Sequence, residues 1–276
     1  MALGCERKDL WLEAYTGGPV MVVIIVEHPD DTVATPSPST PSWRLWLRHS
    51  DGGEWQERAI ECDTSRFLLS RDSYDFVAYG AQDDEGDDRG GGLALCDDTL
   101  LCSSDPCRPL SQVWSGMTSC AVTQADTIRV AVRHRLRPLH IRVLQVDGLQ
   151  RFAEAKAHLT GLAAGCKIDG TELSPQTLTM EGPMRKTDGG LSGSLMIFGH
   201  CPLTVQNHRL LVDLTLRSGR VTTMQWDVTT QLHAGNDPTT ITIDSIAIPA
   251  DNGGAAGGQG ICPSLGDWDT VVIELK

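Results

Sequence analysis

Nine cysteines are the residues of this chain with the widest range of chemistry, because a thiol can form a disulfide, bind a metal or carry a covalent group. They are Cys5, Cys62, Cys96, Cys102, Cys107, Cys120, Cys166, Cys201 and Cys262. Without Cys5, eight remain, and an even number could pair as disulfides in an exported protein. The alternative is a set of buried free thiols, since cysteine is among the residues most often buried. "CSSDPC" at 102 to 107 lacks the second pair or histidine cluster that would complete a zinc site.

A carboxylate cluster is the second candidate for chemistry. It comprises Asp83, Asp84, Glu85, Asp87 and Asp88. Carboxylate oxygens bind hard cations such as calcium, but the D-x-D-x-D-G order of a dedicated calcium loop is missing. We interpret the cluster as a solvated acidic loop and assign no metal site to it, while cation binding by the loop at 83 to 88 stays an open alternative.

The sequence contains no recognisable catalytic constellation. "GLSGS" at 190 to 194 is not the G-x-S-x-G pattern of a nucleophile elbow, and neither a phosphate-binding loop nor a dinucleotide fingerprint occurs. His134 and His140 lie in neighbouring predicted strands, but two histidines alone make no catalytic site. Paired carboxylates for sugar hydrolysis cannot be recognised before the fold is known. We predict no catalytic residue and no cofactor, and therefore no enzyme.

The tryptophans could instead serve binding. Trp43 and Trp46 are three residues apart in one predicted strand, so they face opposite sides of it. Trp226 is expected in a core, and Trp268 begins the last predicted strand. Exposed tryptophans would suit sugar or protein binding, whereas the alternative is packing at the edge of a sandwich.

Size and charge limit the class of protein. A chain of 276 residues is long enough for two domains, and 40% hydrophobic residues indicate a globular fold. A net charge of −13 argues against nucleic-acid binding, which requires basic residues. The longest apolar run, at 20 to 26, is too short to cross a bilayer. The opening "MALG" lacks the charged start and apolar centre of a secretion signal.

Short apolar runs between turn-forming residues predict an almost all-β chain. In the first half we expect strands at 19 to 27, 43 to 48, 54 to 61, 65 to 69 and 74 to 80. Proline-rich 35 to 43 and acidic 83 to 92 are expected loops. Alternation at 128 to 132 and 139 to 143 predicts the start of a new sheet, so we place the domain boundary between 121 and 126.

The second half contains the clearest local prediction, a hairpin over 208 to 229. Leu210, Val212, Leu214 and Leu216 share one face of its first strand, and Ser218-Gly219 supplies the turn. Further strands are expected at 239 to 248 and 269 to 275. Only 149 to 159 has a helical composition. Many short strands in two blocks predict two β-sandwiches.

Several segments, in order, resemble the FimB-like family of fimbrial anchor subunits, which are surface lipoproteins of Gram-negative anaerobes. "CERKDL" at 5 to 10 followed by "VMVVIIVEHP" resembles the family's start. "SRDSYDFVAYGAQDDEG" at 70 to 86 and "VDGLQRFAEAKAHLTGLAAG" at 146 to 165 resemble two internal segments. "LMIFGH" at 195 to 200, "WDVTTQL" at 226 to 232 and "GDWDTVVIEL" at 266 to 275 match later landmarks.

The resemblance implies an all-β protein of two tandem transthyretin-like (immunoglobulin-like) β-sandwich domains. It implies lipid attachment at Cys5, a tether over 1–18, and sandwiches over 19–124 and 125–276. The implied location is the cell outer membrane, exposed on the surface. The implied partners are fimbrial subunits, joined by strand exchange, in which a strand of one subunit adds to a sheet of the next.

Two functions follow from these observations. The first is a lipid-anchored fimbrial anchor or minor subunit that aids adhesion. The second is a glycan-binding surface lipoprotein for nutrient capture, which exposed tryptophans on one face would favour.

Overall fold

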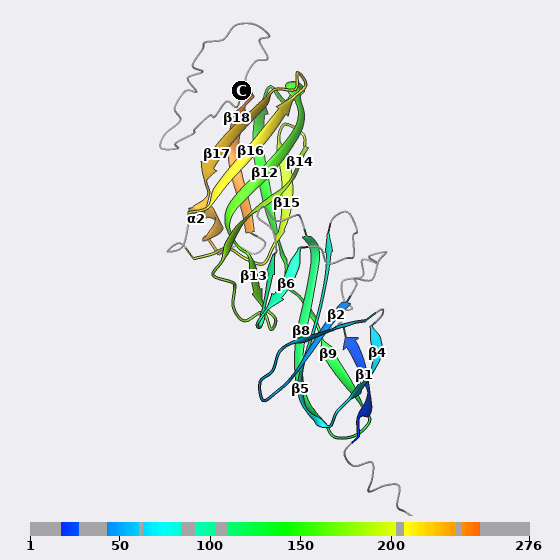
Figure 1. Ribbon diagram of the computed structural model, residues 1–276. Helices are drawn as coiled ribbons and strands as arrows, with labels where there is room; N and C mark the ends of the chain where they lie inside the picture. Colours follow the sequence, from blue (N-terminus) through cyan, green and yellow to red (C-terminus); the bar gives the residue numbers. More distant parts are fainter. Residues whose placement is uncertain are drawn as a thin grey trace, which may run out of the picture. The chain divides into compact units, whose positions relative to one another are not determined.

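The computed structural model describes residues 18–27, 43–60, 63–83, 92–102, 110–202, 207–235 and 239–248. These parts of the chain are almost entirely β, as predicted (Figure 1). The chain divides into two compact units. Unit 1 comprises Met1–Gln82 and Val113–His134, and unit 2 comprises Asp83–Gln112 and Arg135–Lys276. The prediction of an all-β chain with tandem domains is therefore confirmed.

Unit 1 is a sandwich of two sheets. The smaller sheet has the order β4 (Thr64–Leu69), β1 (Val20–Glu27), β9 (Asp126–Ala131). The larger has the order β10 (Arg133–His134), β8 (Leu110–Val122), β5 (Asp72–Asp83), β2 (Trp43–His49), β3 (Gln56–Ala59). Alternate side chains of both sheets form one core, which includes Val22, Ile24, Leu45, Phe76 and Val130. Each such side chain stabilises the fold by about 1.5–3 kcal/mol relative to exposure.

Unit 2 is built on a larger sheet. Its order is β17 (Val221–Asp227), β16 (Arg209–Leu216), β12 (Phe152–Ala163), β14 (Thr177–Lys186), β15 (Leu191–Ile197), β11 (Arg137–Asp147), β18 (Thr239–Ala247). A small sheet of β13 (Gly165–Lys167), β7 (Thr99–Cys102) and β6 (Leu93–Cys96) belongs to the same unit. The helix α2 (Thr229–Leu232) follows β17, and the side-chain amide of Gln231 makes two hydrogen bonds with the backbone of Thr242 in β18.

Each unit contains a pair of parallel strands that are far apart in the sequence. In unit 1, β1 pairs with β9 from Val22↔Asp126 to Glu27↔Ala131. In unit 2, β11 pairs with β18 from Leu139↔Thr239 to Asp147↔Ala247. Long-range parallel pairing therefore occurs in both units.

The predicted hairpin is confirmed. β16 and β17 pair antiparallel from Arg209↔Asp227 to Thr215↔Val221, and Gly219 has a φ of +86° in the turn. The four predicted inward residues of β16 are at most 1% exposed. The strand could be predicted from the sequence because large apolar and polar side chains alternate strictly along it.

The predicted helix at 149–159 is wrong. Leu149–Arg151 forms one 3-10 turn, and Phe152–Ala163 is the central strand β12. Alanine, glutamate and lysine favour a helix in isolation, but Ala155, Ala157 and Leu159 alternate into the core and are at most 1% exposed. Burial against two neighbouring strands outweighs the local preference.

The division into units also differs from the predicted boundary between 124 and 125. β9 lies after that boundary, yet it pairs with β1 of unit 1, while residues 83–112 belong to unit 2. Alternation identifies a strand but does not identify its partner, which explains the difference. The predicted tether and the predicted strand at 269 to 275 lie outside the described residues, Gly18 excepted.

Candidate functional site

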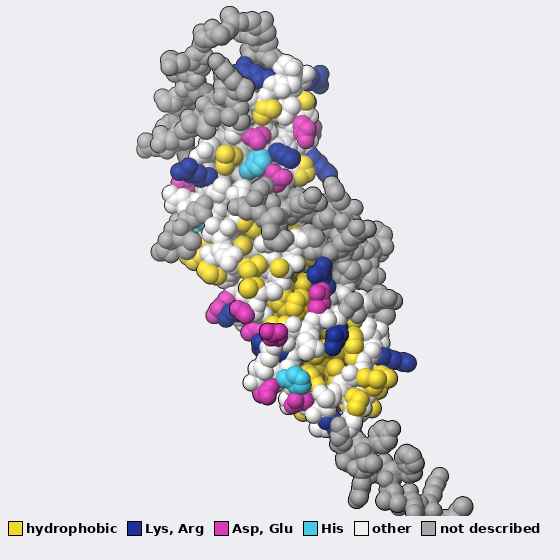
Figure 2. All heavy atoms as spheres, viewed as in Figure 1, with side chains coloured by type: hydrophobic (Ala, Val, Ile, Leu, Met, Phe, Trp, Pro, Cys, Tyr) yellow, Lys and Arg dark blue, Asp and Glu magenta, His cyan; other side chains and the backbone are white. Residues whose placement is uncertain are grey.

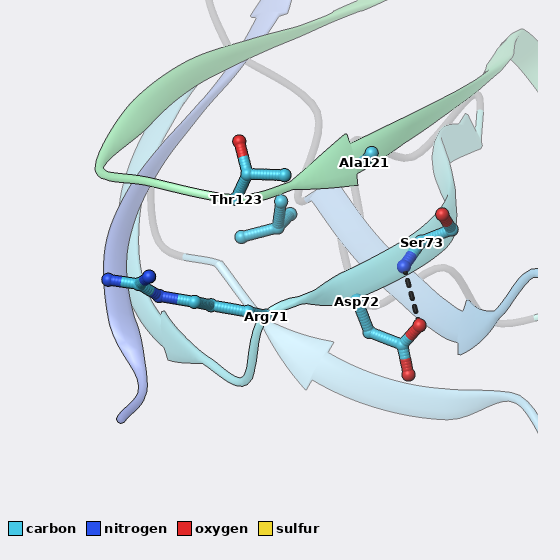
Figure 3. A pocket seen from close by; sticks show the side chains of 6 residues that line it. Arg71, Asp72, Ser73, Ala121 and Thr123 are labelled. Carbon is cyan, nitrogen blue, oxygen red and sulfur yellow. Dashed lines mark hydrogen bonds between the residues drawn. The ribbon is translucent and has the colours of Figure 1, made fainter. Parts of the chain in front are cut away.

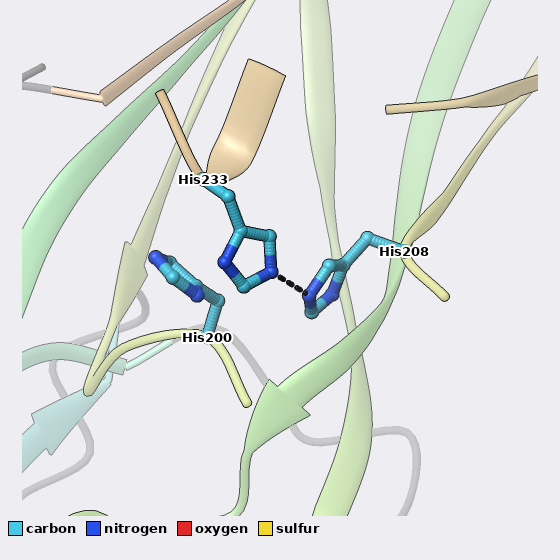
Figure 4. A group of neighbouring side chains, drawn as sticks. All are labelled: His200, His208 and His233. Atoms are coloured by element: carbon cyan, nitrogen blue, oxygen red, sulfur yellow. Dashed lines mark hydrogen bonds between the residues drawn. The ribbon is translucent and has the colours of Figure 1, made fainter. Parts of the chain in front are cut away.

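Three histidines of unit 2 come together from separate connections (Figure 4). His200 follows β15, His208 precedes β16, and His233 directly follows α2. One ring nitrogen from each lies within 4.8 Å of the others. Figure 4 shows the ring of His233 between the other two. We call these three residues the histidine cluster.

His208 is the fixed member of the cluster. Its side chain is fully buried, and its Nδ1 lies 3.2 Å from the carbonyl oxygen of Thr160. Its Nε2 lies 3.1 Å from Nε2 of His233 and 3.2 Å from the carbonyl oxygen of Cys201. Gly161, at a φ of +77°, leaves room for this ring, because a Cβ there would lie 2.5 Å from Nδ1 of His208. The glycine at this position of β12 therefore allows the His208 ring to pack against the backbone.

The other two members are half-buried. The rings of His200 and His233 are 4.3 Å apart between centroids and nearly perpendicular. Nδ1 of His200 is buried and has no hydrogen-bond partner of acceptable geometry. Burial, and then the charge of His233, lower the pKa of His200. Burial, and then the charge of His208, lower the pKa of His233. The lowered pKa of each ring favours the neutral form, in which one nitrogen carries a lone pair.

Sequence reasoning missed this cluster and singled out a different pair. His134 belongs to unit 1, where its ring packs edge-on against Trp114 with centroids 4.9 Å apart. His140 lies on β11 of unit 2 and is not in the cluster. A signal was present, since His208 and His233 flank the predicted hairpin, but the position of His200 could not be derived without the sheet order.

A shallow hollow of about 350 Å³ lies in unit 1 (Figure 3). It is lined by Arg71, Asp72, Ser73, Ala121, Val122 and Thr123. The Asp72 carboxylate accepts a hydrogen bond from the backbone N–H of Ser73 at 2.8 Å and contacts Nδ1 of His49 at 2.7 Å. These contacts, the first of them the larger, lower the pKa of Asp72. The lining contains one carboxylate, whereas glycoside hydrolysis generally needs two.

An apolar strip lies on the outer face of the smaller sheet of unit 1. Met21 is 45% exposed, and its register partner in β4, Leu68, is 66% exposed. Val23 and Ile25 of β1 point to the same side and are half-buried. Figure 2 shows hydrophobic side chains gathered over β1 and β4. We call Met21, Val23, Ile25 and Leu68 the apolar strip. In an antiparallel pair such as β1 and β4 the solvated face is normally polar, so this strip is unusual.

The residues predicted from sequence have different outcomes. Cys5, Asp84, Glu85, Asp87 and Asp88 lie outside the described residues, and Asp83 is the last residue of β5. Cys96, Cys120, Cys166 and Cys201 are free thiols. Among the described residues these four thiols therefore favour the alternative of free thiols over the pairing of all eight cysteines. Burial raises the pKa of the Cys166 thiol to about 11.

The tryptophans give no support to a sugar platform. Trp43 and Trp226 are buried, as expected of core residues, and Trp43 donates a hydrogen bond from its indole nitrogen to Asp63 at 2.8 Å. Trp46 and Trp55 are half-buried, and the guanidinium of Arg48 lies over the Trp55 ring. No tryptophan among the described residues is exposed, and Trp268 lies outside them. Among the described residues, no helix is both long and apolar enough to span a bilayer.

No protein-family model matches the chain, and no curated protein matches it. Solved structures do. A candidate adhesin from Bacteroides ovatus is 14% identical, covers 91% of this chain and 96% of its own, and gives a TM-score of 0.56. A candidate adhesin from Bacteroides thetaiotaomicron is 11% identical. The match covers 84% of this chain and 92% of the other, with a TM-score of 0.50. The fimbrial anchor protein Mfa2 from Porphyromonas gingivalis is 12% identical. The match covers 92% of this chain and 96% of the other, with a TM-score of 0.49. The chain therefore has the fold of the two Bacteroides proteins.

Proposed function

We propose that this chain is a cell-surface adhesion protein that acts as a fimbrial anchor or minor subunit. The observation that supports this most strongly is a fold shared over most of the chain with two candidate adhesins of Bacteroides. The ordered FimB-like segments of the sequence point in the same direction. Both of these candidate adhesins agree with a binding role for the chain.

The proposal includes an anchor in the outer membrane through lipid on Cys5. A glycine precedes Cys5 and a charged stretch, "ERKD", follows it, which suits a tether at a membrane surface. Each buried CH₂ of an acyl chain contributes about 0.8 kcal/mol, so stable attachment requires more than one chain.

This part is tested by expressing the protein with a secretion leader and separating membranes from soluble proteins. We expect the wild type in the outer-membrane fraction and the Cys5→Ala variant in the soluble fraction. Cys96→Ala, which removes an exposed thiol of unit 2, is the control and should stay with the membrane. Membrane retention of Cys5→Ala would refute the lipid anchor.

The apolar strip supports association with fimbrial subunits by strand addition. β4 and β9 form the edges of the smaller sheet within the described part of the chain, so an edge strand offers backbone groups to an incoming strand. Leu68 on β4 and Met21 beside it supply exposed apolar surface for the partner's side chains. We therefore place the added strand along β4.

The strip is tested with Leu68→Lys and its matched control Leu144→Lys, which changes an exposed leucine of unit 2. Both leucines are more than half exposed, so neither change should lower stability by much. We expect Leu68→Lys to weaken binding of fimbrial subunits from the same cells at least about tenfold, about 1.4 kcal/mol. Equal binding by the two variants would place the partner elsewhere.

A further inference from the structure

We propose that the histidine cluster binds a divalent transition-metal ion, with zinc as the ion that it suits best. This binding would be additional to the adhesive role, and it rests on the positions of His200, His208 and His233 alone. Neutral imidazole is a preferred ligand of zinc, copper and nickel, whereas calcium and magnesium prefer oxygen. Three histidines with an open fourth position are a known zinc ligand set.

The spacing of the ring nitrogens is close to what a metal requires. Zinc–nitrogen bonds of about 2.0–2.1 Å place two ligand nitrogens of a tetrahedral site roughly 3.3–3.5 Å apart. Nε2 of His208 and Nε2 of His233 are already 3.1 Å apart, and the whole set lies within 4.8 Å. Because His200 and His233 are half-buried, small rotations of their rings can close the remaining distance without moving the core.

The groups around His208 hold it in the orientation that a ligand needs. In the tautomer in which Nδ1–H donates to the carbonyl of Thr160, Nε2 keeps its lone pair for the metal. The other tautomer, in which Nε2–H donates to the carbonyl of Cys201, would not bind one. A hydrogen bond from the ring's other nitrogen to a backbone carbonyl is a common outer-shell feature of metal-ligating histidine. The close approach of Gly161 then fixes the ring's position.

A metal would also satisfy groups that are otherwise poorly paired. Nδ1 of His200 is buried and has no hydrogen-bond partner of acceptable geometry, and a buried polar group left in this state destabilises the fold. Two ring nitrogens facing each other at 3.1 Å can share only one proton, whereas a cation between them can bind both lone pairs. The charge of Arg137 acts on His200 and opposes a cation, so we expect weaker binding than in a dedicated zinc enzyme.

The test uses the full chain, stripped with a chelator and titrated with zinc by calorimetry. His200→Asn and His233→Asn change the two half-buried ligands, and His140→Asn, a half-buried histidine of the same sheet outside the cluster, is the matched control. We expect one strong zinc site in the wild type and the control. Each cluster variant should weaken it about 100-fold or more, since loss of even an outer-shell partner costs roughly 10–100-fold.

Cobalt substitution distinguishes this site from the thiols. Imidazole ligands give the visible bands of tetrahedral cobalt without a sulfur-to-cobalt charge-transfer band, whereas thiolates add that band. Near-ultraviolet circular dichroism confirms that each variant is folded, and two independent variants guard against one that is not. The proposal is overturned if the folded wild type takes up no zinc, if a folded cluster variant binds it as tightly as the control, or if the cobalt spectrum shows sulfur ligation.

Discussion

Replacing Asp75 by asparagine should destabilise unit 1 far more than other changes of its charged residues. The Asp75 carboxylate, 8% exposed on β5, accepts three hydrogen bonds from side chains of separate segments. Arg48 donates from Nε at 3.1 Å, Ser50 at 3.1 Å and Ser119 at 2.7 Å. This one acceptor joins β2 and its following turn to β5 and β8.

The magnitude follows from what asparagine keeps. The amide retains the shape and one acceptor oxygen, but it loses the charge and turns an NH₂ toward a donor. Hydrogen bonds to charged groups are worth about 1.5–3 kcal/mol each, and the side chain of Arg48 is itself 25% exposed, so water screens part of the loss. We expect a decrease of about 2–3 kcal/mol in the free energy of unfolding. In a unit of about one hundred residues this lowers the melting temperature by roughly 10 °C.

The effect should depend on pH in a defined direction. Burial alone would raise the pKa of Asp75, but the hydrogen bonds from Ser119, Arg48 and Ser50 outweigh it and the pKa lies below its usual value. A carboxyl whose pKa is lower in the folded state stabilises the fold above its unfolded pKa, near 4, and loses that contribution as the pH falls toward the folded value. The difference between wild type and Asp75→Asn should therefore be full at pH 7 and shrink below pH 4.

Urea unfolding followed by tryptophan fluorescence measures the loss in free energy of unfolding at each pH. The signal reports mainly on unit 1, which contains Trp43, Trp46, Trp55 and Trp114. Asp51→Asn, at an exposed turn of the same unit, is the control and should unfold like the wild type. If Asp75→Asn unfolded at the wild-type urea concentration, or if its deficit were the same at pH 7 and pH 3, the reasoning about this network would be refuted.

Three further outcomes are expected. Gly165→Ala should loosen the pairing of β13 with β7 and lower the free energy of unfolding by more than 1 kcal/mol, because the alanine Cβ would collide with the carbonyl oxygen of Leu100. Gly53→Ala is the control in urea unfolding, and it should be near neutral because there is room for a methyl group at Gly53. The exposed Cys96 thiol should react with a thiol reagent at once, whereas Cys166, which is buried and has a pKa of about 11, should react only as unit 2 unfolds. Mass spectrometry of the modified peptides measures both reactions. Zinc at one hundred times its Kd should stabilise the wild type by about 2.7 kcal/mol in thermal melts, and His233→Asn should abolish that gain.

The parts of the fold that could be predicted are those where alternation alone defines the element. Leu210, Val212 and Leu214 mark β16 because large apolar side chains alternate with polar ones along a whole strand. β12 could not be recognised in the same way, since its small core residues, Ala155 and Ala157, are also strong helix formers.

Long-range pairing was the larger obstacle. Nothing local in β9 indicates that it pairs in parallel with β1, about one hundred residues earlier. The histidine cluster was hidden for the same reason: its members lie in connections that only the sheet order brings together. The lipid site predicted at Cys5 depends on a family resemblance and stays a prediction.

The parallel pairing of β1 with β9 and of β11 with β18 has a mechanical consequence. When the chain is pulled at its two ends, tension reaches β1 at its start, Val20, and reaches β9 at its end, Ala131, through β10 of the same unit. These points lie at opposite ends of a parallel ladder, so the pull runs along the strands and strains all the hydrogen bonds of the ladder together instead of peeling them one by one. Unit 2 repeats this geometry between β11 and β18 with eight paired positions, against six in unit 1. Under tension along the chain, the β1–β9 ladder should therefore rupture before the β11–β18 ladder.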